Sequence, residues 1–408
     1  MIIVEAGMKV LSKLHDAQFQ AFFVGGCVRN LLLDLPIEEI DIATNASPEM
    51  IKALFPKAIS IGIAFGVMLI KEDKYAFEVA TFRKDISYSD GRHPDQIKFS
   101  DMHEDALRRD FTINGMFYDP FNKKVYDYVG GKIDLRNKII RAIGFPRKRF
   151  HEDKLRLIRA IRFAARFNFT LDAKTELAII KEAPTLMQSV SRERIWSELK
   201  KITQYDNIAY AFQLLHKCGL LFQMFPELGK HLSDMDIKQC LKIISKLSKT
   251  LPTILIIAPF FLQITAKQIE IIFRDFKISN YEINLILKWK DIYPALKNYN
   301  SHKIKLVHFL ASPESSLFLQ LFESFLTEDE LKIFKEKFSQ FQAKLHPHVL
   351  RIIHKTPIIS AYDLIKLNVP PGKLLGEILQ EAENIAIEKN INNKEEILKK
   401  LFNLGLLK

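Results

Sequence analysis

The stretch Phe22 to Ala46, FFVGGCVRNLLLDLPIEEIDIATNA, is the part of the chain around which the rest is organised. Residues 22–24 form a short apolar run that is typical of a buried strand, and Gly25-Gly26 end it. Residues 27–33 have helical spacing, with Arg29 in the first turn. Backbone N–H groups, the positive end of a helix dipole and a guanidinium together suit an anion. The stretch therefore predicts a phosphate-binding turn.

A second strand is expected over residues 39–44, after a turn at residues 34–36. Alternation along a strand places Glu39 and Asp41 on one face and the isoleucines on the other. Two carboxylates beside a phosphate-binding turn suit a divalent metal. A glycine pair or an acidic pair taken alone is usually an ordinary turn or a solvent-facing pair, but their order within one strand-helix-strand unit favours function.

Composition indicates a folded chain with a basic surface. The 408 residues are 48% hydrophobic, which supplies ample core for two to four domains and excludes a disordered protein. The net charge of +12 favours a polyanionic partner, although the same charge also fits a generally basic amino-acid composition of the organism's proteins. The three cysteines are far apart and lack metal or disulfide spacing, which fits a reducing compartment.

The first residues do not have the pattern of a signal peptide, because Glu5 stands where basic residues would be expected. The longest apolar run, residues 251–264, is interrupted by prolines and is too short for a membrane span. We therefore expect a soluble cytoplasmic protein with no membrane partner.

The two halves of the chain differ in their periodicity. A helix is expected over residues 2–19, and strand-like runs cover 59–70, 75–82, 115–119, 124–128 and 139–143. Ten of the 15 glycines precede residue 150. From Glu152 onward apolar residues recur at spacings of three and four, so the remainder is expected to be all-helical.

Two further features follow the acidic strand that is expected over residues 39–44. Glu78 faces away from Phe77 and Val79 in the strand expected over residues 75–82, where it is either a third carboxylate or a surface residue paired with a cation. Residues 84–99, KDISYSDGRHPDQIKF, are polar and carry Gly91 and Pro94, which predicts a mobile loop beside the site.

Residues 104–115, EDALRRDFTING, form another chemical cluster. The guanidinium groups of Arg108 and Arg109 suit phosphate oxygens, while Asp110 and Asn114 can bind ribose hydroxyls or hold the arginines in place. The alternative is a group of ion pairs at a helix end.

Residues 149–163, RFHEDKLRLIRAIRF, are expected to form one helix with Asp153 and Arg156 on one face and Arg159 one turn further along. Asp153 could accept a hydrogen bond from the exocyclic amine of C or A, and Arg156 could donate to a ring acceptor. The alternative is a simple salt bridge between them.

These motifs resemble those of the class II tRNA nucleotidyltransferases and bacterial poly(A) polymerases, within the DNA polymerase beta-like superfamily. The glycine turn with its acidic pair, the RRDFT segment and the EDxxR segment occur in the family's order, and the resemblance covers about residues 20–200. Glu39 and Asn30 stand where the family usually has Asp, and Gly115 stands where it has Ala. Residues 191–194 resemble the end of the family's neck region, for which we expect a structural role.

The resemblance implies an α+β protein, with a mixed-sheet nucleotidyltransferase head over residues 1–145. A helical neck with the nucleotide-selecting template would follow over 146–205, and a helical, tRNA-binding body and tail over 206–408. It implies addition of C and A to tRNA 3′ ends from CTP and ATP with release of pyrophosphate, through binding of the tRNA acceptor arm and without an obligate protein partner. The loop over residues 84–99 is implicated in the family in passing from C to A addition, which argues against an enzyme that adds only C.

The implied roles divide among the motifs. Glu39 and Asp41 would hold Mg²⁺ ions about 3.5–4 Å apart, one lowering the pKa of the RNA 3′-hydroxyl and the other binding the triphosphate. The implied catalytic residues are Glu39, Asp41 and Glu78, and the implied nucleotide-binding residues are Gly25, Gly26, Arg29, Arg108, Arg109, Asp110, Asn114, Asp153, Arg156, Arg159 and Arg162.

Three alternatives remain open from the sequence. A relative specialised for A only, for CC only or for poly(A) tails would share these motifs. A non-catalytic RNA-binding relative would fit the replacements at Glu39 and Asn30. A basic helical scaffold would require all three motifs to be coincidental.

Overall fold

The computed structural model describes residues 2–62, 66–87 and 96–407, and the chain forms two compact units, Met1–Lys230 and His231–Lys408. The first unit combines a mixed sheet with helices, and the second is helical in its described residues. The expected α+β class is confirmed. The finer division at residues 145 and 205 stays a prediction.

A seven-stranded sheet organises the first unit, in the order β3-β4-β5-β2-β1-β8-β9. Within this sheet, as far as the structure describes it, only β2 and β5 pair in parallel, with Asp41 opposite Glu78. The remaining neighbours are antiparallel. The strands are β1 (Ala21–Val24), β2 (Asp41–Thr44), β3 (Ile59–Gly62), β4 (Val67–Glu72), β5 (Tyr75–Thr81), β8 (Met116–Asp119) and β9 (Lys124–Asp127).

Successive residues of β1 supply the cores on the two faces of this sheet. Phe22 and Val24 belong to a buried cluster that includes Ala106 and Phe117. Phe23 points to the opposite face, where α1 packs so closely that a Cβ at Gly7 would lie 3.1 Å from the Phe23 ring. This alternation is the one expected of a strand buried on both faces.

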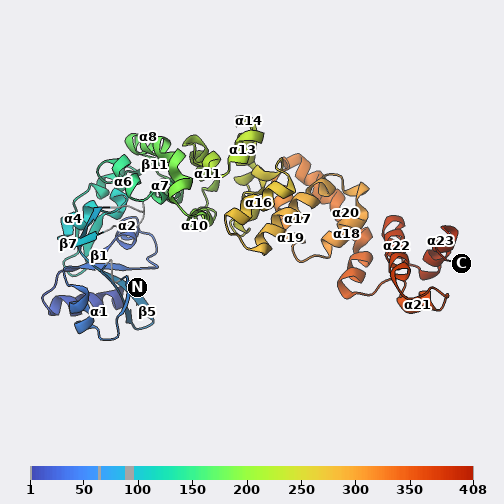
Figure 1. Ribbon diagram of the computed structural model, residues 1–408, viewed down its shortest axis with the longest axis horizontal. Helices are drawn as coiled ribbons and strands as arrows, with labels where there is room; N and C mark the ends of the chain where they lie inside the picture. Colours follow the sequence, from blue (N-terminus) through green and yellow to red (C-terminus); the bar gives the residue numbers. More distant parts are fainter. Residues whose placement is uncertain (1, 63–65, 88–95, 408) are drawn as a thin grey trace. The chain divides into compact units, whose positions relative to one another are not determined.

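The helices of the first unit lie before, between and after the strands of the sheet in the chain. Figure 1 shows α6, α7 and α8 between the strands and α10 and α11. The helices are α1 (Ile2–Asp16), α2 (Gly26–Leu32), α3 (Pro48–Leu54), α4 (Met102–Leu107), η2 (Thr112–Asn114), α5 (Gly131–Arg136), α6 (Pro146–Glu152), α7 (Leu155–Phe167), α8 (Ala173–Glu182), η3 (Ala183–Thr185), α9 (Leu186–Ser189), α10 (Arg192–Ile202), α11 (Ile208–Lys217), α12 (Leu220–Met224) and α13 (Pro226–His231).

Several expected elements differ in extent from those observed. The first helix ends at Asp16, and β2 begins at Asp41, so Glu39 precedes the strand. Only β10 (Ile139–Ile140) forms within residues 139–143, and it pairs in parallel with β11 (Thr170–Leu171). The region beyond Glu152 is therefore not entirely helical, because the edge of β10 takes a short partner from the segment after α7.

Both ends of the polar segment over residues 84–99 belong to strands. Strands β6 (Arg83–Ser87) and β7 (Gln96–Phe99) pair antiparallel, so the expectation of a loop throughout was wrong at both of its ends. The rest of the expected loop, residues 88–95 with Gly91 and Pro94, lies outside the described residues.

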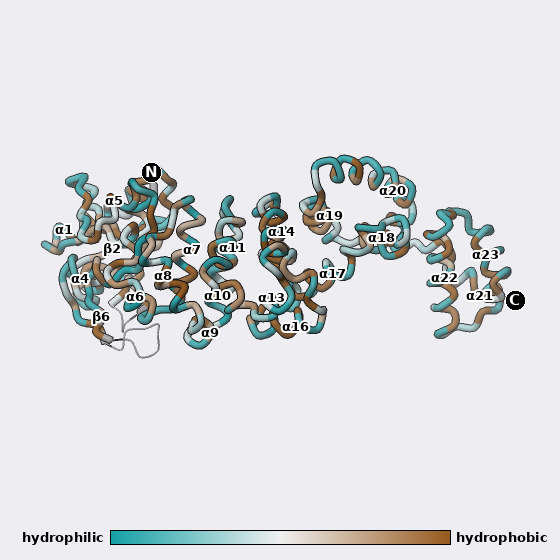
Figure 2. Tube along the Cα trace, turned by 90° about the horizontal axis from the view of Figure 1, so that it is seen from above, coloured by the Kyte–Doolittle hydropathy of each residue, from teal (hydrophilic) through white to brown (hydrophobic). Residues whose placement is uncertain are grey.

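The second unit is built from amphipathic helices. Figure 2 shows hydrophobic and hydrophilic residues alternating along its helices, whose apolar faces bury residues such as Trp289 and Phe318. Its elements are α14 (Asp234–Ile244), α15 (Thr253–Ile256), η4 (Ala258–Phe261), α16 (Ala266–Asp275), α17 (Asn280–Lys297), η5 (Tyr299–Ser301), α18 (Lys303–Leu310), α19 (Ser315–Ser324), α20 (Glu328–His354), α21 (Ala361–Ile365), α22 (Lys373–Lys389) and α23 (Lys394–Asn403). Within the described part of the chain, no helix has the length and apolar character needed to cross a bilayer.

Candidate active site

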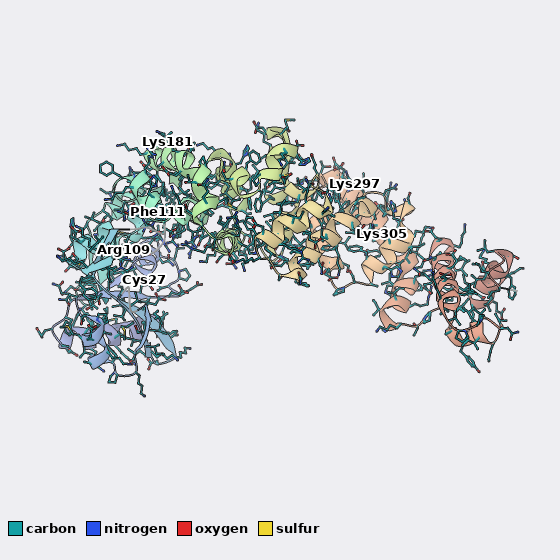
Figure 3. All side chains as sticks on the ribbon, in the orientation of Figure 1. Cys27, Arg109, Phe111, Lys181, Lys297 and Lys305 are labelled. Carbon is teal, nitrogen blue, oxygen red and sulfur yellow. The ribbon has the colours of Figure 1, made fainter. Side chains whose placement is uncertain are left out.

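A cavity of about 800 Å³ lies within the first unit, between the β1–α2 turn and the helices α7 and α10. Figure 3 labels Cys27 and Arg109, which both line it, and Phe111, which packs edge-on against Phe163 of α7. The lining residues are Gly25, Gly26, Cys27, Arg29, Asn30, Glu38, Glu39, Asp41, Arg108, Arg109, Asp110, Asn114, Asp153, Leu155, Arg156, Arg159, Arg162, Phe163, Arg166, Arg194, Lys201, Gln204 and Tyr205. Nine of these carry positive charge and five carry carboxylates, so the cavity as a whole favours a polyanion.

The glycine turn brings the backbone close to both an arginine and a carboxylate of the cavity. Gly25 has φ 72° and ψ −128°, a conformation that favours glycine, and it begins the first turn of α2. A Cβ at Gly25 would lie 3.4 Å from Nη1 of Arg109 and 3.7 Å from Oδ2 of Asp41. The turn, which has no side chains, therefore lies next to both an arginine and a carboxylate. A phosphate group bound to a metal ion requires this arrangement.

Three carboxylates lie close together near the start of β2. Asp41 lies at the start of β2, Glu78 is its register partner on β5, and Glu39 lies two residues before β2 begins. Burial and the nearby Glu78 raise the pKa of the Asp41 carboxyl to about 6; Arg109 opposes this rise and Glu39 adds to it. Negative charge is thus crowded here, and a divalent cation would relieve it.

These carboxylates fit a metal that completes its coordination with a substrate. No three His, Cys, Asp or Glu side chains in the described ranges converge as a ready-made metal cage. Mg²⁺ commonly takes one or two protein carboxylates and fills its remaining positions with phosphate oxygens and water. Glu39 and Asp41 both line the cavity, whereas Glu78 lies beside Asp41 but does not line it.

The adjacent arginines are held by one buried carboxylate. Asp105, which is fully buried at the end of α4, accepts from Nε of Arg108 at 2.9 Å and from Nη2 of Arg109 at 3.0 Å. The Arg109 guanidinium also lies over the Phe117 ring, at 5.2 Å from its centroid. These contacts fix both arginines at the cavity wall, and Asp105 was not among the site residues expected from the sequence.

Asp110 and Asn114 link the head to α7. Asp110 accepts from Nη2 of Arg159 at 2.5 Å and from Nδ2 of Asn114 at 3.0 Å. Burial alone would raise the pKa of Asp110, but the charge of Arg159 and these hydrogen bonds hold it well below its usual range. The carboxylate therefore stays ionised, in the role of arginine holder that the sequence left as one of two options.

Arg29 is more enclosed than a simple phosphate ligand would be. Its side chain is buried, and it donates to Oδ1 of Asn114 at 2.5 Å and to Oδ1 of Asn30 at 2.9 Å. Its guanidinium lies 4.6 Å from the centroid of the Phe167 ring. The amide oxygen of Asn30 thus accepts a hydrogen bond from Arg29, where an Asp would also add a negative charge. Because the hydrogen bond is kept, Asn30 can take the place of the Asp that is usual in the family.

The expected single helix over residues 149–163 is interrupted at the residues expected to read the base. Helix α6 ends at Glu152 and α7 begins at Leu155, with Asp153 in an extended conformation (φ −150°, ψ 108°). The Asp153 carboxylate accepts from the Leu155 N–H at 3.0 Å, a local bond that competes with helix continuation. The expected placement of Asp153 and Arg156 on one helical face was therefore wrong, although both line the same cavity.

Each of these two side chains has a partner of its own. Asp153 accepts from Nη2 of Arg194 at 3.0 Å, and Arg156 donates to Oε2 of Glu152 at 2.7 Å. The salt bridge between Asp153 and Arg156, the alternative reading of the sequence, is not the pairing that forms. Arg194, for which only a structural role was expected, comes from the first turn of α10 and lines the cavity beside Asp153.

The cavity brings together every expected site residue except Glu78. Arg159 and Arg162 reach it from successive turns of α7, and Arg162 pairs with Glu198 of α10 at 3.2 Å. Lining residues that the sequence did not single out include Arg166, Lys201 and Tyr205. Helical spacing from Arg162 could have indicated Arg166, but no local pattern indicates the approach of α10.

Three family models match successive parts of the chain. The Poly A polymerase head domain matches residues 21–141, and the RNA- and SrmB-binding site of polymerase A matches residues 168–232. A tRNA nucleotidyltransferase domain 2 matches residues 253–401.

Curated relatives match over nearly the whole length. The CCA-adding enzyme of Lactobacillus helveticus is 32% identical over 411 residues, covering 96% of this chain and 95% of the relative. That of Lactococcus lactis subsp. lactis is 33% identical over 394 residues, covering 95% and 94%. The solved CCA-adding enzyme of Bacillus stearothermophilus in complex with CTP matches with a TM-score of 0.76 and 26% identity, covering 98% of each chain. The family expected from the motifs is confirmed, and the chain belongs to the CCA-adding enzyme family of nucleotidyltransferases.

Proposed function

We propose that the protein adds C and A residues to the 3′ end of tRNA from CTP and ATP, releasing pyrophosphate, and that it selects the nucleotide with its own side chains. The observation that carries this proposal is the single cavity in which carboxylates, a bare glycine turn and a row of arginines meet. Relatives with the name CCA-adding enzyme that match along the chain support the same reaction.

The proposed roles of the residues near the glycine turn are metal binding and phosphate binding. Glu39 and Asp41 would hold Mg²⁺, which when bound supplies Lewis-acid stabilisation of the phosphates and activation of the 3′-hydroxyl. The backbone of Gly25 and Gly26 and the side chain of Arg109 would bind phosphates. Glu78 contributes negative charge that favours cation binding without lining the cavity.

Selection of the base would fall to Asp153 and Arg156. A carboxylate only accepts hydrogen bonds, so that of Asp153 suits the exocyclic amine of C or A and opposes the carbonyl oxygen of U or G. Arg194 and the Leu155 N–H already orient this carboxylate. Arg108, Arg159 and Arg162 would complete the nucleotide site, with Asp110 and Asn114 holding Arg159 and Arg29 in place.

The remaining proposals concern the rest of the chain and its setting. We assign residues 1–145 to the catalytic head, 146–205 to the neck and 206–408 to a body and tail that bind the acceptor arm. Three buried thiols, Cys27, Cys218 and Cys240, form no disulfide and fit a cytoplasmic location.

The proposal is tested by incubating the protein with tRNAs that end at the discriminator base, at C and at CC, each with CTP or ATP, and sequencing the products. We expect C to be added to the first two acceptors and A to the third. Addition of A alone or of CC alone would assign a specialised relative, a long A tail would assign a poly(A) polymerase, and no metal-dependent addition would refute the proposal.

Replacing Asp153 by Asn is expected to weaken selection against UTP. The amide can donate to O4 of uracil, so the ratio of kcat/KM for CTP to that for UTP should fall by about 10- to 100-fold. Steady-state incorporation with each nucleotide measures this ratio. Arg194→Gln should shift it in the same direction by releasing Asp153.

The control for this prediction is Arg192→Gln, which removes a cation from the same helix. The Arg192 guanidinium donates to the Met187 carbonyl oxygen, and Arg192 does not line the cavity. Equal selectivity in Asp153→Asn and the wild-type protein would assign base reading to other groups.

A further inference from the structure

A group of four cations in the cavity lining carries more positive charge than the neighbouring acidic groups neutralise. These are Arg29, Arg162, Arg166 and Lys201. Glu198 pairs with Arg162 at 3.2 Å and with Lys201 at 3.6 Å, and the charge of Asp110 acts on Arg29 and Arg162. Burial lowers the pKa of Arg29 to about 10, with the charge of Arg166 as the next contribution. Mutual repulsion of this kind favours a multiply charged anion beside these cations.

Arg166 has the geometry of an anion-binding guanidinium. It extends from the last turn of α7, with its guanidinium 5.2 Å from the centroid of the Phe167 ring and 5.5 Å from that of Tyr205. Among the residues that the structure describes, none accepts a hydrogen bond from it. Aromatic contacts thus hold the group, while its N–H donors remain available in the bidentate arrangement that phosphate oxygens accept.

We propose that Arg166, oriented by Tyr205 and assisted by Lys201, binds the β- and γ-phosphates of the nucleotide and receives the pyrophosphate as it leaves. The inference rests on the proposed function and adds residues outside the sequence motifs. In the reaction the RNA 3′-oxygen forms a bond to the α-phosphorus, and the bond from that phosphorus to the bridging oxygen of the β-phosphate breaks. The electron pair leaves with pyrophosphate, and the hydroxyl proton passes to solvent.

A phosphodiester of the RNA is the competing occupant, and the charge favours pyrophosphate. Each RNA phosphate carries one negative charge, whereas this group combines four cations with two carboxylates, Glu198 and Asp110. Arg29 joins the cluster directly to the glycine turn, so the cluster is continuous with the site proposed for the triphosphate.

The test measures binding of Mg²⁺-pyrophosphate to the full-length protein by calorimetry, which requires no turnover. We expect Arg166→Gln to weaken pyrophosphate affinity by about 10-fold or more, because a charge-assisted bidentate contact is lost. Arg166→Lys should recover part of the affinity. Tyr205→Ala should weaken it less than Arg166→Gln does, and Tyr205→Phe should preserve it. Lys181→Gln, which removes an exposed cation from α8 (Figure 3), should bind as the wild type does.

Two further measurements separate the possible failures. In steady-state assays of nucleotide addition, Arg166→Gln should raise the inhibition constant of pyrophosphate by the same factor by which it weakens pyrophosphate binding. The Kd of the Arg166→Gln protein for tRNA should stay unchanged. Unchanged pyrophosphate affinity in Arg166→Gln, or weakened tRNA binding with normal pyrophosphate affinity, would overturn the inference. Pyrophosphate binding that depends on Arg166 in a protein that adds no nucleotide would instead refute the proposed function and leave the anion site standing.

Discussion

Asp41→Asn is expected to lower the single-turnover rate of CTP incorporation by about 10³-fold or more. Asp41 lies close to Glu39, Glu78 and the glycine turn, where burial and, after it, the charge of Glu78 raise the pKa of its carboxyl to about 6. An amide cannot supply the charge that a divalent ion requires, and loss of several kcal/mol of transition-state stabilisation corresponds to this factor. Rapid-quench incorporation into a tRNA that lacks its 3′ CCA measures the effect.

Binding of tRNA should change little in the same variant. Asp41 lines the cavity and lies outside the second unit, so the Kd for tRNA is expected to remain within about threefold of the wild-type value. Asp73→Asn is the matched control, because it removes a surface carboxylate paired with Lys9 at the turn between β4 and β5, and Asn tolerates the positive φ of 54° there. Incorporation by Asp41→Asn within tenfold of the wild-type rate would show that the assigned metal site is wrong.

Glu182→Gln is expected to destabilise the first unit by about 3–5 kcal/mol, the usual cost of leaving one charge of a buried pair without its partner. Glu182 is 3% exposed and accepts from Lys154, which is 4% exposed and lies directly between Asp153 and Leu155. For a unit of this size the loss corresponds to a fall in Tm of roughly 10 °C. Differential scanning calorimetry of the full-length protein measures it.

Two variants distinguish the buried pair from its exposed neighbour. Arg147 also donates to Glu182, at 2.9 Å, but its side chain is 63% exposed, so Arg147→Gln should cost no more than about 1 kcal/mol. The double variant Lys154→Met/Glu182→Leu should recover most of the stability, because apolar residues can replace a buried ion pair. A Glu182→Gln protein as stable as Arg147→Gln would contradict the assigned role.

The effect of Glu182 should also depend on pH. Burial raises the pKa of its carboxyl, but hydrogen bonds from Lys154 and Arg147 outweigh burial and hold the pKa below its ordinary value of 4.5. A carboxyl with a lowered folded-state pKa contributes its stability fully above pH 4.5, and this contribution is lost as the pH falls through the folded-state value. The difference in Tm between the wild-type protein and Glu182→Gln should therefore shrink in acid.

Local pattern was sufficient to predict how the glycine turn and the carboxylates of β2 and β5 are arranged. A glycine pair between an apolar run and a helical segment leaves few structures other than the observed turn, with Gly25 at positive φ. Alternation placed Asp41 on the open face of β2 and Glu78 on the corresponding face of β5, and the parallel pairing of these strands then made them neighbours.

The arrangement of Asp153 and Arg156 could not be predicted in the same way. Helical periodicity continues through residues 149–163, yet the chain leaves the helix at Asp153 because its carboxylate bonds to the Leu155 N–H and to Arg194, 41 residues away. Lys154 is likewise held by Glu182, 28 residues away. Such breaks depend on partners that only the tertiary fold brings together, so spacing along the chain carries no signal for them.

The most direct test of the assigned site is anomalous diffraction from crystals of the protein soaked with Mn²⁺ and a non-hydrolysable CTP analogue. We expect a manganese peak at the carboxylates of Glu39 and Asp41, at roughly 2.0–2.2 Å from at least one oxygen of Asp41, with the cytosine against Asp153 and Arg156. A manganese site remote from Asp41, or a base bound away from Asp153, would contradict the role proposed for this cavity.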